Sequence, residues 1–138
     1  MRKVTGLLSI CFFLLSASYV ASGDKVKLKL KAPRSIFMKP TGMYTHAPVN
    51  VRVRAELEGT PENPEEYYCL EEEWDWGDDT ESFHEPDCDP YEAGAELKRI
   101  YNSTHTFRYP GNYTIYLRLQ RGGDTIITSK VTVRIRGS

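Results

Sequence analysis

Apolar and polar residues alternate with a period of two from residue 25 onward, in short runs separated by Gly, Pro, Asn and Asp. Because successive side chains of a β-strand point to opposite faces, this alternation predicts half-buried strands. The sequence shows no segment longer than about ten residues with a helical period. We therefore expect an all-β fold of about seven antiparallel strands, whose spacing indicates two sheets packed as a β-sandwich.

The strands are expected at residues 25–31, 49–57, 68–76, 80–84, 104–108, 113–120 and 125–136, with a brief pairing at 97–101. The proline-containing segment between the first two is expected to be a loop. In the third strand Trp74 and Trp76 set the inward register, so Glu72 also points inward. Its carboxylate either lies near the end of the sandwich, where water reaches it, or pairs with a basic side chain.

The first 23 of the 138 residues resemble a secretory signal peptide, with a basic start at Met1-Arg2-Lys3, an apolar stretch and then small residues. The apolar stretch is about 12 residues long, shorter than the roughly 20 that a bilayer-spanning helix needs. The alternatives are a retained anchor and lipidation of Cys11. We expect cleavage near residue 22 or 23, one domain at residues 24–138, and a secreted, periplasmic or cell-surface location.

Two of the three cysteines, Cys69 and Cys88, remain after cleavage. In an oxidising compartment an even pair of cysteines indicates a disulfide. Metal ligation is disfavoured because the two are 19 residues apart, outside any CxxC pattern.

One set of short motifs identifies a family. Its pieces are Trp74-Asp75-Trp76-Gly77-Asp78, His105-Thr106-Phe107 and Pro110-Gly111-Asn112-Tyr113. In this order and spacing they resemble the PKD domain, the immunoglobulin-like module named after the polycystic kidney disease protein, over roughly residues 49–136. The resemblance implies an immunoglobulin-like sandwich and a non-catalytic extracellular module.

The motif residues have plausible structural roles in such a sandwich. Trp74 would fill the space between the sheets, Gly77 would permit a tight exit from its strand, and Tyr113 could form a tyrosine corner. Three residues depart from the usual family pattern: Trp76 replaces a phenylalanine, Asp79 a glycine and Phe107 a tyrosine.

Charge is strongly segregated along the chain. Residues 56–97 contain 17 acidic residues and no Lys or Arg, whereas residues 24–55 and 98–138 each contain eight basic residues and one acidic residue. Cross-strand pairing between acidic and basic strands is one explanation. The other is an acidic face that binds a cationic partner or calcium, which takes six to eight oxygens. The candidate metal ligands are Asp75, Asp78, Asp79, Glu81, Asp87 and Asp89.

The sequence does not favour an enzyme or a nucleic-acid-binding protein. The three histidines are scattered, and the GxSxG, HExxH and phosphate-loop motifs are absent from the sequence. We expect no cofactor apart from calcium, and an extracellular protein or glycan as partner. Exposed tyrosines such as Tyr44, Tyr67, Tyr91 or Tyr116 could stack on sugars. The alternative function is a structural or accessory component of an envelope or secreted assembly.

Overall fold

The computed structural model describes residues 25–43 and 46–137. The predicted signal peptide and Tyr44 lie outside these residues. The described chain forms eight strands and a short 3-10 helix. They are β1 (Lys27–Lys31), β2 (Ser35–Phe37), β3 (Val49–Glu58), η1 (Pro64–Tyr67), β4 (Glu71–Asp75), β5 (Glu81–His84), β6 (Ile100–Phe107), β7 (Gly111–Arg121) and β8 (Asp124–Arg136).

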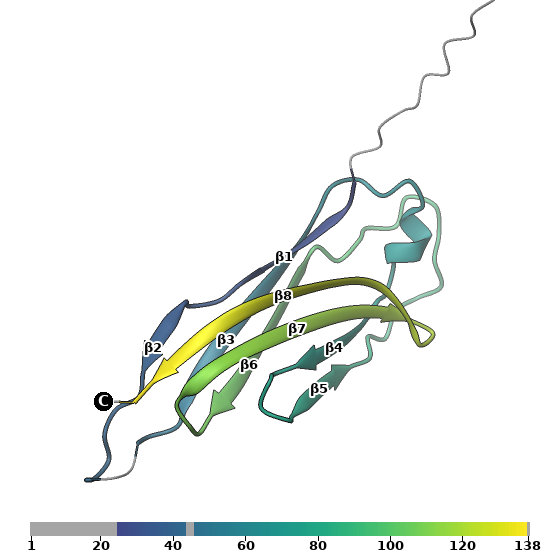
Figure 1. Ribbon diagram of the computed structural model, residues 1–138. Coiled ribbons are helices and arrows are strands. Elements are labelled where there is room, and N and C mark those ends of the chain that lie inside the picture. Colours follow the sequence, from purple (N-terminus) through teal and green to yellow (C-terminus); the bar gives the residue numbers. More distant parts are fainter. Residues whose placement is uncertain (1–24, 44–45, 138) are drawn as a thin grey trace, which may run out of the picture.

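The strands form two sheets that pack as a sandwich. One sheet has three strands in the order β1-β3-β6, and the other has five in the order β2-β8-β7-β4-β5. In Figure 1, β7 and β8 cross in front of β3 and β6. Strands β1, β3 and β6 occupy the places of A, B and E in an immunoglobulin domain, and β4, β7 and β8 those of C, F and G. The predicted all-β, immunoglobulin-like sandwich is confirmed.

The core lies between the sheets, where the alternate residues of the strands meet. The inward side chains of β3 and β7 are almost fully buried, and Trp74 and Trp76 lie among them. The tryptophans therefore have the inward register that the sequence predicts. The buried core residues are Leu28, Met38, Val51, Val53, Ala55, Leu57, Leu70, Trp74, Trp76, Tyr101, Phe107, Ile115, Leu117, Leu119, Val133 and Ile135.

The structure corrects the strand prediction in three places. The loop expected before residue 49 contains β2, which pairs in parallel with β8. The two short strands expected at 97–101 and 104–108 are one strand, β6, because residues 100–107 pair continuously with β3. The strand expected at 68–76 is confined to residues 71–75, because Cys69 has a positive φ of 56° and Gly77 one of 76°.

Within residues 25–43 and 46–137, no helix is long and apolar enough to cross a bilayer.

Candidate functional site

The aromatic residues of the PKD-like motifs form a continuous row through the core. Trp74 stacks on Trp76 with ring centroids 5.5 Å apart, and Trp76 stacks on His105 at 4.6 Å. Phe107 then contacts His105 at 4.8 Å and Tyr113 at 4.3 Å. Because both tryptophans and Phe107 are buried, this row is packing that joins the two sheets and offers little surface to a ligand.

The turn after β4 is fixed by its own carboxylates. Asp75 Oδ1 accepts a hydrogen bond from the Gly77 amide at 3.0 Å, and Asp78 Oδ2 lies 2.7 Å from His105 Nε2. Burial disfavours ionisation of Asp78. Hydrogen bonds from Thr80 and His105 outweigh it, so the pKa of this carboxyl lies below its ordinary value. The acidic side chains of this turn therefore stabilise the fold.

Tyr113 ties the start of β7 to the preceding turn. Its hydroxyl donates a hydrogen bond to the carbonyl oxygen of Tyr109 at 2.8 Å, across Pro110 and Gly111. A tyrosine near the start of strand F that bonds to backbone a few residues upstream has the geometry of a tyrosine corner. Burial raises the pKa of this hydroxyl, which favours its donor form.

The six residues predicted as metal ligands do not form one site. Asp75 is engaged by Gly77 and by Arg118, whose Nη2 lies 3.7 Å from its Oδ2. Within the part of the chain that the structure describes, no three His, Cys, Asp or Glu side chains come together to hold a metal ion. The predicted set of Asp75, Asp78, Asp79, Glu81, Asp87 and Asp89 is instead spread over the end of β4, the β4–β5 turn, β5 and the segment after it.

Ion pairs between strands account for part of the charge segregation. Six acidic residues of segment 56–97 pair with a lysine or arginine outside it. The pairs are Glu56 with Lys31, Glu58 with Lys29, Glu65 with Arg121, Glu72 with Lys98, Glu73 with Arg118, and Asp75 with Arg118. The predicted pairing of acidic and basic strands is therefore present, while other carboxylates of the segment, such as Glu81 and Glu85, form no ion pair with any described residue.

The described tyrosines considered for sugar stacking have protein neighbours. Tyr91 makes an edge contact with Tyr68 at 5.3 Å. The Tyr116 ring lies between two cations, with Arg118 at 5.6 Å and Lys130 at 6.0 Å from its centroid. Tyr67 packs against the core, and burial raises its pKa. These contacts explain the tyrosine positions without a ligand.

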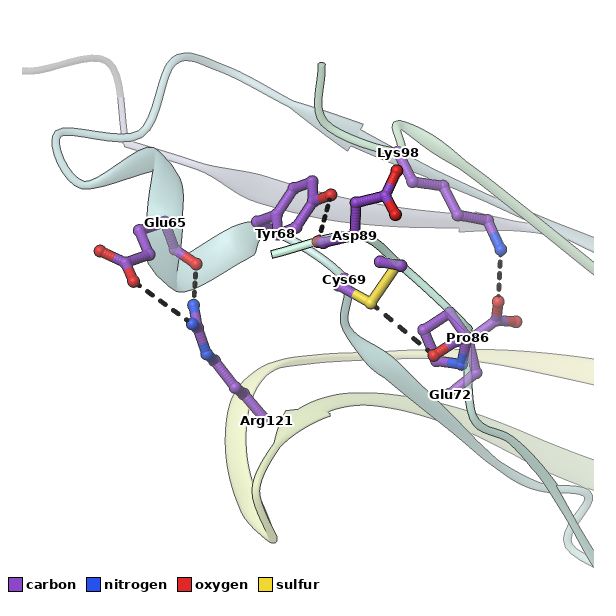
Figure 2. The surroundings of a disulfide bond; sticks show 9 residues. Glu65, Tyr68, Cys69, Glu72, Pro86, Asp89, Lys98 and Arg121 are labelled. Atoms are coloured by element: carbon purple, nitrogen blue, oxygen red, sulfur yellow. Dashed lines mark hydrogen bonds and ion pairs between the residues drawn. A yellow bond between two sulfur atoms is a disulfide. The ribbon is translucent and has the colours of Figure 1, made fainter. Parts of the chain in front are cut away.

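A disulfide fastens the segment between β5 and β6 to the start of β4. Cys69 and Cys88 are bonded, with their Cα atoms 6.1 Å apart, as the sequence predicts. Next to this bond, the Tyr68 hydroxyl donates to the carbonyl oxygen of Asp89 at 2.9 Å (Figure 2). The long irregular segment is thereby held against the sandwich.

Glu72 is a buried carboxylate, with 5% of its surface exposed. Its Oε1 accepts a hydrogen bond from Lys98 Nζ at 2.6 Å (Figure 2). Its Oε2 accepts one from Trp74 Nε1 at 3.1 Å. The sequence left two alternatives for this carboxylate, contact with water near the end of the sandwich or pairing with a basic side chain. The structure shows the pairing, with Lys98. Burial, together with the Glu72 charge, raises the pKa of Tyr101 to about 12.

This ion pair forms part of a groove on the open side of the sandwich, between β5 and β6. The groove has a volume of about 300 Å³. It is lined by Glu72, Trp74, Ser82, Phe83, His84, Lys98, Asn102 and Ser103. Ser82 and His84 pair with Trp74 and Glu72 across β4 and β5, so the four share the groove-facing side of their sheet.

A second hollow of about 300 Å³ lies on the other side of β5. It is lined by Glu71, Glu72, Glu73, Phe83, His84, Glu85 and Gln120. Phe83 is 69% exposed here, beside Glu73. Sequence reasoning missed Phe83 and Lys98 as surface residues of interest, because they belong to no motif. The alternation in residues 81–84 was the available signal for an outward Phe83.

The fold places the chain in the class of immunoglobulin-like β-sandwich domains. No family model matches the chain, and no curated protein matches its sequence. A similar solved structure is the CARDB domain of a Pyrococcus furiosus protein in complex with di-metal ions. The two share 8% identity with a TM-score of 0.44, over 82% of this chain and 94% of that one.

Proposed function

We propose that this protein is a non-catalytic, exported module of the PKD type that binds another macromolecule outside the cytoplasm. The row of rings from Trp74 to Tyr113 supports the PKD assignment, because motif pieces that are far apart in the sequence contact one another. The Cys69–Cys88 disulfide supports export, because such bonds persist in oxidising compartments.

The observation that carries the binding role is the open side of the sandwich. Two hollows flank the short strand β5, and Phe83 exposes 69% of its surface there. Exposed aromatic side chains within a polar rim are typical of protein interfaces and of sugar-binding surfaces. The partner is therefore a protein or a carbohydrate that docks around β5.

Binding of the purified, disulfide-bonded protein to arrays of glycans and of extracellular protein fragments tests this role. We expect a defined set of ligands whose binding is weakened by Phe83→Ser. Tyr109→Ser is the matched control, because Tyr109 is also exposed, at 73%, and follows β6 away from β5. Ligands that bind both variants equally would contradict the proposed surface.

Export is tested separately by expressing the full chain in a secreting host and sequencing the N-terminus of the product. We expect the secreted protein to begin at Gly23 or Asp24. A product that retains Met1, or one that stays with the membrane fraction through a lipid on Cys11, would contradict cleavage and release.

A further inference from the structure

The five-stranded sheet has one face in the core and one outer face. Trp74, Ile115 and Val133 are buried in the core, so the residues that alternate with them along β4, β7 and β8 point outward. In Figure 1 the outer face is the side of β7 and β8 toward the viewer. The other sheet lies behind it, and no third layer of described strands covers it.

Charge on the outer face is divided between its two sides. From residue 128 onward, the outward residues of β8 include three basic residues and no acidic one, whereas those of β4 and β5 include four acidic residues and no basic one. The basic residues are Lys130, Arg134 and Arg136, and the acidic residues are Glu71, Glu73, Asp75 and Glu81. Strand β7 separates the two sides. The face is therefore positive at β8 and negative at β4 and β5.

The register places opposite charges at the two ends of one row across the strands. Lys130 is the partner of Tyr116 between β8 and β7. Asp75 is the partner of Tyr116 between β4 and β7, and of Glu81 between β4 and β5. Because neighbouring strands are about 4.8 Å apart, Lys130 and Glu81 are about 14 Å apart along this row. Neither forms an ion pair with a described residue, and they are too far apart to pair within one chain.

The next row holds a central ion pair and an exposed aromatic ring. It consists of Thr128, Arg118, Glu73 and Phe83 on the same four strands. Arg118 Nη1 lies 2.7 Å from Glu73 Oε1, and Phe83 at the end of the row is 69% exposed. Exposed aromatic residues of this kind are enriched in protein interfaces.

A second copy fits both rows when a twofold axis runs parallel to the strands, between β7 and β4. Such an axis reverses the order of the strands and keeps the rows in place, so β8 lies over β5 of the second copy and β7 over its β4. Lys130 then meets Glu81 of the second copy, and Thr128 meets its Phe83, once on each side of the axis. An axis across the strands would place the acidic strands over their own copies, where like charges repel.

We propose that the outer face of the five-stranded sheet is the contact surface of a homodimer, in which the acidic side of each copy lies over the basic side of the other. This inference rests on the proposed binding surface around β5 and names a second copy as the partner on its outer side. The groove between β5 and β6 lies on the other side of β5 and stays open to a further ligand. Two rows across four strands cover less than the roughly 800 Å² per partner of a standard interface, so the dimer is weak and salt-dependent.

Sedimentation equilibrium of the purified, disulfide-bonded protein measures self-association. We expect a monomer–dimer equilibrium with a Kd of about 10–100 µM at low salt, which weakens by about tenfold in about 0.5 M NaCl.

Charge reversal at the two ends of the first row tests how the copies are oriented. Lys130→Glu and Glu81→Lys each place like charges against one another on both sides of the axis and should raise the Kd by about tenfold or more. In an equal mixture of the two variants every such contact again joins opposite charges, so a heterodimer should form with about the affinity of the parent. Both positions are exposed, so the variants should fold, and their Tm values check this.

Lys27→Glu is the matched control, because Lys27 is an exposed lysine of β1, in the other sheet, without an ion pair to a described residue. Its Kd should stay within about twofold of the parent. A mixture of Lys27→Glu with Glu81→Lys has the same net charges as the first mixture but keeps one contact between like charges, so it should not reach the affinity of the parent.

Three results would overturn the proposal: a single monomeric species up to about 500 µM at low salt, a dimer whose Kd neither charge reversal changes, or a mixture of Lys130→Glu and Glu81→Lys that stays monomeric. A monomer that still binds array ligands through Phe83 would overturn the dimer and leave the general binding role intact. Failure of that role is read separately, from arrays on which Phe83→Ser changes nothing.

Discussion

The substitution Lys98→Met tests the ion pair at the floor of the groove. Lys98 Nζ lies 2.6 Å from Oε1 of Glu72, whose side chain is 5% exposed. Hydrogen bonds to charged groups contribute about 1.5–3 kcal/mol, and the Lys98 side chain is 48% exposed, which places this bond toward the low end. Methionine keeps the apolar stem and leaves a buried carboxylate with Trp74 as its remaining donor. We expect a loss of about 2 kcal/mol in the free energy of unfolding.

The assay is chemical and thermal unfolding with the disulfide intact. For a domain of this size, 2 kcal/mol corresponds to a fall in Tm of roughly 8 °C. Glu72→Gln keeps an acceptor for Trp74 without the charge, so the double variant should lose less than the sum of the two single losses by about 1.5 kcal/mol.

A matched control comes from the ion pair of Lys29 with Glu58, whose side chains are 54% and 43% exposed. Lys29→Met should cost about 0.5 kcal/mol or less, because exposed pairs contribute little. If Lys98→Met costs as little as Lys29→Met, or if the double-variant cycle shows no coupling, the reasoning about a buried, paired carboxylate is wrong.

Three further predictions concern the fold around the site. Because the folded pKa of Asp78 is lowered, its stabilising effect is full above the unfolded pKa of about 4 and is lost as the pH falls below it. The Tm difference between the parent and Asp78→Asn should therefore shrink between about pH 5 and pH 2. Replacing both Cys69 and Cys88 by Ser should cost about 3 kcal/mol, because the disulfide closes a loop of about 20 residues. Gly77→Ala should destabilise the protein by about 2 kcal/mol or more, because a Cβ there would lie 2.5 Å from a β7 carbonyl oxygen.

Each of these has a result that would contradict it. A constant Tm difference across the pH range would show that ionisation of the Asp78 carboxylate does not stabilise the fold. A double cysteine variant as stable as the parent would mean that the disulfide does not constrain the unfolded chain. For Gly77 the control is Gly94→Ala, since Gly94 also has a positive φ, of 88°, but no atom within 4 Å of an added Cβ. Equal losses for both glycines would show that backbone strain, and not the close approach, sets the cost.

The sequence predicted what local alternation determines. The burial of Trp74 and Trp76 and the inward position of Glu72 followed from the period of two. The sequence could not identify β2, because three residues are too short for alternation to be recognised. It divided β6 in two, because Asn102 and Ser103 are common in loops, whereas the pairing with β3 that makes them a strand is a long-range contact.

The candidate site was less predictable than the fold. Lys98 and Glu72 are 26 residues apart and meet only because the segment that leads into β6 packs against β4 of the other sheet. The charge division on the outer face depends on which strands become neighbours, and alternation within a strand does not encode its neighbours. The acidic residues suggested a metal site by composition, but their side chains are used by the turn and by ion pairs or are spread apart along the chain.

Zero-length cross-linking tests most directly whether a second copy covers the outer face beside β5. A carbodiimide joins a lysine amine to a carboxylate only where the two touch, and Lys130 and Glu81 are about 14 Å apart within one chain. In an equal mixture of isotope-labelled and unlabelled protein, we expect cross-linked peptides that join Lys130 of one copy to Glu81 of the other. Lys31 and Glu56, 2.8 Å apart in one chain, are the internal control. Cross-links between Lys31 and Glu56 without any from Lys130 to a second copy would contradict the account.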